Sequence, residues 1–295
     1  MNGRKSESEK FAGALRTYSC EAMMQDNKAL QAGTSHNLGQ NFAKAFDLKF
    51  QSESGTTEYA WNTSWGVSTR MVGGLVMTHG DDIGLRVPPL LAPIELVIVP
   101  IYRTDEERSL VLEAANRIAK SLGAWDRRES ARLRVHIDAR DGMKPGAKYY
   151  EWELRGIPLR MEIGPRDLDA GQAVLVRRDT REKRPYPIDT IGESIHELLS
   201  AIQENLLETA RARREQNSVR GDISYDRFRQ IMDGDGAFVY AGWCGSAECE
   251  AKIKEETKAT IRCLPDEEFR SADAPTNCLR CGEKSVAEAL WAKAY

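Results

Sequence analysis

The sequence lacks a long apolar segment. No hydrophobic run approaches the roughly 18 residues of a membrane-spanning helix, and the opening residues MNGRKSESEK are too polar for a signal peptide. These two absences argue against a membrane protein and favour a cytoplasmic location. With 41% hydrophobic and 29% charged residues among 295, the chain has enough apolar content for the cores of two or three globular domains.

The sequence also lacks an excess of positive charge. Its 42 Lys and Arg residues are outnumbered by 45 Asp and Glu residues, which gives a formal net charge of −3 at pH 7. A field of this sign does not attract nucleic acid to the molecule as a whole. DNA is therefore not an expected partner, and any RNA contact has to use local patches.

Cysteine is scarce along most of the chain and clustered near its end. Cys244 and Cys249 form one close pair, and Cys278 and Cys281 form a second pair in a CxxC motif. In a chain expected to be cytoplasmic, such pairs are typical of metal ligands rather than disulfides. Four thiolates complete a closed tetrahedral site, so we predict a structural zinc ion. The alternative is a group of buried free cysteines, which is the role that we predict for Cys263.

Residues 1–92 are expected to form the first of three domains. Alternating polar residues predict a strand over residues 16–23, and a second strand over residues 28–34 follows a turn. Thr, Ser, His and Asn at positions 34–37 are favourable cap residues, so a helix is predicted over residues 38–46. Gln31 and Thr34 are separated by an odd number of residues, and they face the same side of the second strand only if its backbone bends at Gly33.

Arg70 lies at the start of a probable helix in the stretch WGVSTRMVGGLVMTHGDDIGLRVPP, residues 65–89. An arginine beside the free N–H groups of a helix start suits a polyphosphate, although a surface arginine before an ordinary buried helix is an alternative. Gly73 and Gly74 suggest close backbone approach, and GDDIG ends the helix in a turn. The expected apolar flank of this helix consists of Met71, Val72, Leu75, Val76 and Thr78.

Two acidic residues follow that helix. Asp81 and Asp82, together with His79, are either functional or cap the end of the helix, and the sequence favours neither alternative. His136 and His196 fall within strand and helix patterns, so we expect them to be structural.

Residues 93–217 are expected to form a second domain. IELVIVPIY is a continuous apolar run of the buried parallel-strand type, and a helix with an apolar face follows over residues 104–122. Alternating strands and helices predict a mixed sheet covered on both faces. The other elements predicted here are strands over 132–138, 159–163 and 173–177, and helices over 149–155 and 191–217.

Aromatic residues and both signs of charge gather in this second domain. Such a surface can contact single-stranded RNA bases by stacking and edge hydrogen bonds. A solvated amphipathic helix with its aromatic residues packed inward is an equal alternative. The candidate RNA-facing residues are Lys148, Glu151, Glu153, Arg160 and Arg166.

Residues 218–295 are expected to form a small α+β domain around the zinc site. Helices are predicted over 225–232 and 250–257, and strands over 237–243 and 260–264. The chain finishes on WAKAY, an apolar ending that is unusual for a frayed terminus.

Five stretches of the sequence occur in a distinctive order. They are EKFAGA (9–14), QAGTSHNLGQNFAKAF (31–46), WGVSTR (65–70), THGDDIGLRVPP (78–89) and EWELRGIPLRMEIGPRDL (151–168). In this order they resemble the prolyl-tRNA synthetases, in the archaeal/eukaryote-like form that carries a C-terminal zinc domain. The resemblance extends from about Gly3 to Tyr295 without a large gap.

The resemblance implies a class II synthetase that activates proline with ATP and Mg²⁺ and transfers it to tRNA(Pro). Arg70 corresponds to the motif-3 arginine that lies against the adenine and γ-phosphate of ATP. Gln31, Thr34 and Ser68 fall on the nucleotide side, and His36 falls on the proline side. The guanidinium of Arg70 would supply a fixed positive charge to the leaving polyphosphate. The neutral side chains would position the nucleotide without adding charge.

The resemblance also assigns the other two domains. Residues 93–217 correspond to the anticodon-binding domain, and the two cysteine pairs correspond to the family's zinc ligands. The family's C-terminal tyrosine, here Tyr295, turns back toward the active site.

The chain departs from the family in one large respect. It carries only the third of the three class II motifs, so a partial antiparallel-sheet catalytic domain is expected. Motif 1, which forms the family's homodimer interface, and motif 2, whose arginine holds the α-phosphate, are not found in it. We therefore expect no proline-dependent ATP–pyrophosphate exchange by this polypeptide alone. The alternatives are a non-catalytic tRNA-binding protein or subunit, and a zinc enzyme unrelated to tRNA, which would need an open metal position.

Overall fold

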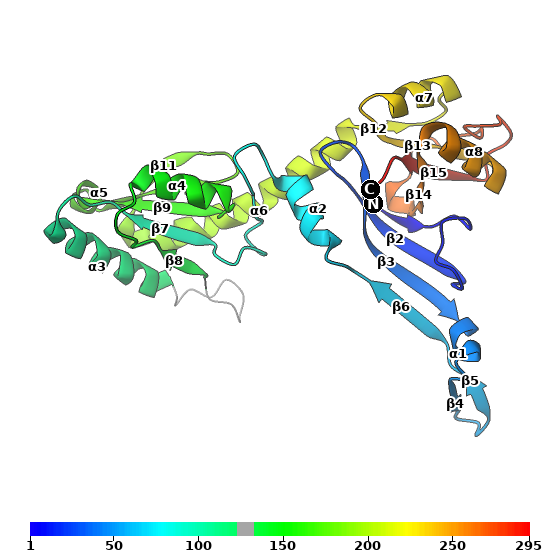
Figure 1. Cartoon of the computed structure of the whole chain (residues 1–295), viewed down its shortest axis with the longest axis horizontal. Coiled ribbons are helices and arrows are strands. Elements are labelled where there is room, and N and C mark those ends of the chain that lie inside the picture. Colours follow the sequence, from blue (N-terminus) through cyan, green and yellow to red (C-terminus); the bar gives the residue numbers. More distant parts are fainter. Residues whose placement is uncertain (123–132) are drawn as a thin grey trace. The chain divides into compact units, whose positions relative to one another are not determined.

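The computed structural model describes residues 1–122 and 133–295 (Figure 1). Packing divides the chain into two compact units. The first unit combines residues 1–78 with residues 212–295, and the second contains residues 79–211. The mixed sheets and helices bear out the expected α/β and α+β content. The division into domains at residues 92 and 217 stays a prediction.

The first unit is built on an eight-stranded sheet in the order β12-β13-β15-β14-β1-β2-β3-β6 (Figure 1). β12 pairs with β13 in parallel, and the other neighbouring strands are antiparallel. The strands are β1 (Asn2–Arg4), β2 (Arg16–Met23), β3 (Ala29–Gly39), β6 (Asn62–Gly66), β12 (Ser218–Arg220), β13 (Phe238–Trp243), β14 (Thr260–Pro265) and β15 (Ala287–Ala292). The remaining elements are α1 (Asn41–Ala45), β4 (Lys49–Gln51), β5 (Thr57–Tyr59), α2 (Arg70–His79), α7 (Tyr225–Asp233), α8 (Ala247–Thr257) and η2 (Glu267–Phe269).

The apolar residues of this sheet pack on both of its faces. On one face, Phe228 from α7 and Ile253 from α8 pack with Trp291 from β15. On the other face, Met23 and Cys263 belong to a second buried cluster. The cluster confirms the prediction that Cys263 lies in the core.

The helix predicted over residues 38–46 forms only over Asn41–Ala45, and its predicted cap is wrong. β3 continues to Gly39, and α1 spans only Asn41–Ala45. Thr34 to Asn37 therefore lie in a strand and not in a helix cap, because they pair with β2 on one side and with β6 on the other. The N-cap of α1 is Gln40, which makes no side-chain cap hydrogen bond.

The helix that begins at Arg70 forms as predicted, but its apolar flank is not buried by the described residues. Only Gly74 in α2 is buried, whereas Val72 is 68% exposed. A Cβ atom on Gly74 would lie 2.7 Å from Leu30 Cδ2, so this glycine does permit the predicted close approach. Gly73 does not, because the nearest atom to its Cβ position is 3.8 Å away.

The second unit is built on a five-stranded sheet in the order β11-β10-β9-β7-β8. β7 is parallel to β8 and β9, and the other pairs are antiparallel. The strands are β7 (Leu96–Pro100), β8 (Val135–Ile137), β9 (Leu159–Ile163), β10 (Gln172–Arg177) and β11 (Lys183–Pro187). The helices are α3 (Asp105–Leu122), α4 (Pro145–Leu154), α5 (Pro165–Asp169), η1 (Ile188–Thr190) and α6 (Ile191–Gln216).

Helices cover both faces of this sheet, as the sequence predicts. Leu96 and Ile98 of β7 pack in one cluster with residues of α3 and α6. The alternate residues Val97 and Val99 pack against Trp152 of α4. β7 is therefore buried on both faces, which explains its continuous apolar sequence.

Several details of this unit differ from the predictions, among them the start of α4 at Pro145 instead of Tyr149 and the short helix α5, which has no predicted counterpart. The apolar pattern of residues 104–122 predicts Leu110 on the inner face of α3, but this side chain is 52% exposed. β8 begins at Val135, and Arg132, the first residue of its predicted span, lies outside the described residues. The edge strand β11 was not predicted, since its sequence KRPYP contains two prolines. Among the described residues, no helix is both long and apolar enough to cross a bilayer.

Candidate functional site

Four cysteine side chains converge in the first unit. The Sγ atoms of Cys244, Cys249, Cys278 and Cys281 all lie within 4.8 Å of one another. Zinc–sulfur bonds of about 2.3 Å in a tetrahedral site place the sulfurs about 3.8 Å apart. The cluster therefore fits a zinc ion with little adjustment, and four protein ligands leave no open position for catalysis.

The two loops that carry these cysteines contain tight backbone turns. Gly245 and Gly282 have φ angles of +85° and +74°, in the left-handed region that favours glycine. The N–H of Cys278 donates to the Glu283 carbonyl at 2.7 Å, which closes the second loop. The N–H of Leu279 donates to the Gly242 carbonyl at 2.8 Å and joins this loop to the end of β13.

The thiols of the cluster differ in acidity. Burial raises the pKa of Cys278, but hydrogen bonds from the backbone N–H groups of Cys281 and Arg280 outweigh it and bring the pKa to about 7. Burial raises the pKa of Cys249 to about 12. A cation among the four sulfurs would favour the thiolate form of each, which is the form that ligates metal.

The three polar residues predicted near the substrates lie on one face of the sheet. In the β2–β3 register, His36 is opposite Thr17, Thr34 is opposite Ser19, and Gln31 is opposite Glu21. Thr17, Ser19 and Glu21 are two residues apart and face one side, so their partners face that side too. The register shift after Cys20, which leaves Ala32 unpaired, supplies the irregularity that the odd spacing of Gln31 and Thr34 requires.

Arg70 begins α2 close to this strand. Gly66 pairs with Thr34, and only a short loop from 67 to 69 separates Gly66 from Arg70. Ser68 Oγ accepts a hydrogen bond from the Arg70 N–H at 3.4 Å. The Arg70 side chain is exposed and has no ion-pair partner among the described residues, and the first turn of α2 contains no acidic residue. The guanidinium is therefore available to an anion.

Asp81, which the sequence left open as functional or structural, organises the loop after α2. Its carboxylate receives two hydrogen bonds from Arg178, at 2.6 and 3.0 Å, and two from Arg86, at 2.6 and 3.0 Å. The backbone N–H groups of Ile83 and Gly84 also donate to it. Hydrogen bonding to Arg178 holds the pKa of this carboxyl well below its usual range. Its role in the second unit is therefore structural.

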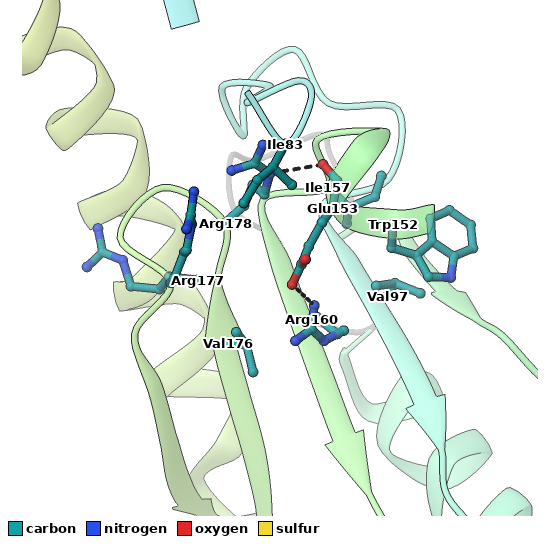
Figure 2. A pocket seen from close by; sticks show the side chains of 10 residues that line it. Ile83, Val97, Trp152, Glu153, Ile157, Arg160, Val176, Arg177 and Arg178 are labelled. Carbon is teal, nitrogen blue, oxygen red and sulfur yellow. Dashed lines mark hydrogen bonds and ion pairs between the residues drawn. The ribbon is translucent and has the colours of Figure 1, made fainter. Parts of the chain in front are cut away.

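A pocket with an empty volume of about 320 Å³, including space open to solvent, lies beside this ion-pair network. Figure 2 shows Glu153 between two arginines that line it. Arg160 donates to the Glu153 carboxylate at 2.6 Å, and Arg178 donates to the Glu153 carbonyl at 2.9 Å (Figure 2). The pocket wall is thus held by internal ion pairs.

The five candidate RNA-facing residues have different surroundings. Lys148 is only 2% exposed, and its Nζ atom donates to the Asp138 carbonyl at 2.9 Å. Glu151 forms ion pairs with Arg140 and Arg155, and Glu153 pairs with Arg160, as described above. Arg166 is exposed and has no ion-pair partner among the described residues. Arg166 is therefore the member of this set that is most available to an external phosphate.

Sequence reasoning missed two buried residues that position candidate site residues. Asp138 is fully buried, and its carboxylate accepts hydrogen bonds from Arg140 and Trp152. Thr17 is 2% exposed, and its Oγ1 atom lies 3.0 Å from His36 Nδ1. The alternation in RTYSCEAM places Thr17 on the polar face of the strand, which gave no sign of burial, and its partner His36 lies 19 residues further along the chain.

Comparison with known proteins agrees with this architecture. The family description "Prolyl-tRNA synthetase, C-terminal" matches residues 225–295, and "Anticodon binding domain" matches residues 95–203. A protein of Cytophaga hutchinsonii named Proline--tRNA ligase is 50% identical over 293 residues, which cover 99% of this chain and 58% of the relative. Relatives of the same name from Christiangramia forsetii and Roseiflexus sp. are 48% and 47% identical over all of this chain, and over 58% and 59% of their own lengths.

These matches place the chain among the aminoacyl-tRNA synthetases. Within that class, it belongs to the prolyl-tRNA synthetase family and corresponds to the C-terminal portion of those proteins. The chain spans about three-fifths of the length of the curated relatives that it matches.

Proposed function

We propose that this chain supplies the motif-3, anticodon-binding and zinc-binding parts of a proline–tRNA ligase. The observation that carries the proposal is the 45–51% identity to proteins of that name over 99–100% of the chain. The shared face of Gln31, Thr34 and His36 supports it, because three polar side chains lie on one side of β3, and Thr34 pairs with Gly66, four residues before Arg70.

The reaction proceeds in two displacements. A proline carboxylate oxygen attacks the α-phosphorus of ATP, the α–β phosphate bond breaks, and pyrophosphate leaves. A terminal ribose hydroxyl of tRNA(Pro) then attacks the prolyl carbonyl carbon, and AMP leaves with the electron pair of the broken bond. Arg70 neutralises charge on the polyphosphate of Mg²⁺-bound ATP, Gln31, Thr34 and Ser68 hold the nucleotide, and His36 contacts proline.

The other parts of the chain serve tRNA and stability. Residues 93–217 bind the anticodon, with Arg166 as a phosphate contact and Glu151, Glu153, Arg160 and Lys148 holding the surface in place. Zinc held by the four cysteines contributes folding energy to residues 218–295 and takes no part in the displacements. A cytoplasmic location and a homodimer formed through motif 1 belong to the same proposal.

The decisive experiment is proline-dependent ATP–pyrophosphate exchange. We expect none from the chain alone, and exchange when a second polypeptide supplies the two-fifths of the Cytophaga hutchinsonii relative that the chain does not span. Arg70→Ala should abolish the restored exchange, and Arg229→Ala, which changes an exposed arginine of α7, should leave it intact. Strong exchange by the chain alone would contradict the expectation that the reaction needs the part of the relative that this chain does not span.

A second candidate function is tRNA binding without catalysis. The match of residues 95–203 to an anticodon-binding domain favours it, since that domain needs no substrate site. If the second polypeptide restores no exchange but the chain retains tRNA(Pro) in filter binding, this function replaces the first. Affinity should fall as salt rises, because phosphate contacts release counterions; a flat salt response would contradict tRNA binding in either form.

A further inference from the structure

The His36 ring is held on β3 by two residues from the preceding segment. Thr17 Oγ1 lies 3.0 Å from Nδ1 of the imidazole, and the Phe11 ring lies 4.8 Å from it, centroid to centroid, at an interplanar angle of 42°. Thr17 is opposite His36 in the strand register, so the backbone fixes the approach of the two side chains. The imidazole therefore cannot turn freely about its χ angles.

The hydrogen bonds of Thr17 determine which atom is the donor in this contact. A hydroxyl group has one hydrogen and two acceptor lone pairs. The Phe11 N–H donates to Thr17 Oγ1 at 3.0 Å and occupies one lone pair. Thr17 is 2% exposed, and among the described residues its Oγ1 atom has one other hydrogen-bond partner, His36 Nδ1, which donates or accepts according to the tautomer of the ring. If Nδ1 carried a hydrogen, the Thr17 O–H would be buried without a partner, which is unfavourable.

We infer that Thr17 is a positioning residue that holds His36 in the neutral tautomer with its hydrogen on Nε2. The Thr17 hydroxyl donates to Nδ1, so the other nitrogen of the ring becomes a hydrogen-bond donor. The Phe11 ring fixes the plane in which that donor lies. Thr17 does not touch the substrate, and its effect passes through the imidazole.

This tautomer determines what His36 can bind. An Nε2–H group pairs with a carboxylate or carbonyl oxygen, whereas an unprotonated Nε2 would pair with the N–H groups of an amino acid. Resting on the function proposed above, the inference assigns His36 to an oxygen of the prolyl carboxyl group. In the opposite tautomer, Nε2 carries no hydrogen, so Nε2 and the carboxyl oxygen of proline would both be acceptors and could not form a hydrogen bond.

The tautomer can be measured directly in the purified chain. Histidine labelled with ¹⁵N in the ring gives long-range ¹H–¹⁵N correlations that distinguish a protonated from an unprotonated ring nitrogen. The chain has four histidines, and His36→Asn identifies the signals of His36 by their loss. We expect His36 at pH 8 to show an unprotonated Nδ1 and a protonated Nε2.

Variants at position 17 separate positioning from simple packing. Thr17→Val keeps the shape and removes the hydroxyl, so His36 should become a mixture of tautomers, while His136 stays unchanged as an internal reference. Thr17→Ser should restore the wild-type pattern. Thr63→Val, which changes an exposed threonine of β6, is the matched control. A protonated Nδ1 in the wild type, or an unchanged His36 pattern in a folded Thr17→Val chain, would overturn the inference.

The measurement also distinguishes this inference from the proposed function. The tautomer is read without substrate, so failure of proline-dependent exchange leaves its outcome intact. In the complemented enzyme, Thr17→Val should raise KM for proline about tenfold, with little change in KM for ATP. If KM for proline is unchanged while His36→Asn abolishes exchange, the proposed function stands and the role of Thr17 does not.

Discussion

Asp81→Asn should destabilise the second unit more than any conservative change on its surface. The substitution keeps the size of the side chain and removes the negative charge that Arg178 and Arg86 share. Arg178 would suffer most, because its side chain is 3% exposed and its remaining hydrogen bond is to the Glu153 carbonyl. Arg86 is 28% exposed and regains water as a partner.

The magnitude follows from this difference in exposure. Removing one partner of a buried ion pair costs about 3–5 kcal/mol, because the other charge stays buried. Asparagine retains one acceptor oxygen, and Arg86 recovers solvation, so we expect a loss near the lower limit, about 3 kcal/mol. For a unit of this size, that loss lowers the melting temperature by on the order of 10 °C.

Differential scanning calorimetry of the whole chain, with urea unfolding followed by circular dichroism, measures the effect. Asp82→Asn is the control, because Asp82 is exposed and the change should stay within about 0.5 kcal/mol. The pKa of Asp81 is depressed by its arginine contacts, so its contribution is present above the unfolded pKa of about 3.9 and is lost only as pH falls through the folded pKa. The loss should therefore be equal at pH 5 and pH 7. Equal stability of the two variants would refute the reasoning.

Three further predictions concern other parts of the chain. Cys278→Ser, or chelation of zinc, should release about one zinc ion per chain, detected by a colorimetric dye, and lower the melting temperature of the first unit; unchanged stability would contradict a structural metal. Burial raises the pKa of Glu250, so protonation favours the fold. Glu250→Gln, which retains the bond to Ser6, should stabilise the chain by up to about 1 kcal/mol at pH 7 in urea unfolding, and this advantage should shrink toward pH 5. Arg166→Ala should reduce the slope of log affinity for tRNA against log salt concentration by about 1, without loss of stability. Lys148→Met should instead lower the free energy of unfolding by about 2 kcal/mol. A loss of stability in Arg166→Ala, with a smaller salt slope in Lys148→Met, would contradict both assignments.

Elements with a strong local pattern could be predicted from the sequence. The strand Arg16–Met23 has the predicted bounds because its alternation matches a sheet with one buried face. α3 and α6 each lie within one residue of their predicted ends, because long amphipathic periods leave little ambiguity. The four cysteines come together as their spacing predicts, although zinc binding by them stays a prediction.

The failures have a common physical cause, which is pairing between remote segments. Thr34 to Asn37 are good cap residues, yet they form a strand because β2 and β6 both supply hydrogen-bond partners. Val72 looked like a core residue of an amphipathic helix, but the described residues leave it exposed. Asp81 gave an ambiguous local signal because Arg178 lies 97 positions further along the chain. Local sequence specifies neither the partner of a strand nor the partner of a charge.

The position of β1 inside the eight-stranded sheet bears on the order in which the protein can fold as it is synthesised. Gly3 pairs with Pro265, so one side of the first strand has no neighbour until the last part of the chain has emerged from the ribosome. Residues 79–211 form their own unit and can fold during this delay, which lasts on the order of 10 s at typical rates of translation. Until then β1 lacks its β14 partner, and an unpaired strand edge is the kind of surface that chaperones and aggregation compete for.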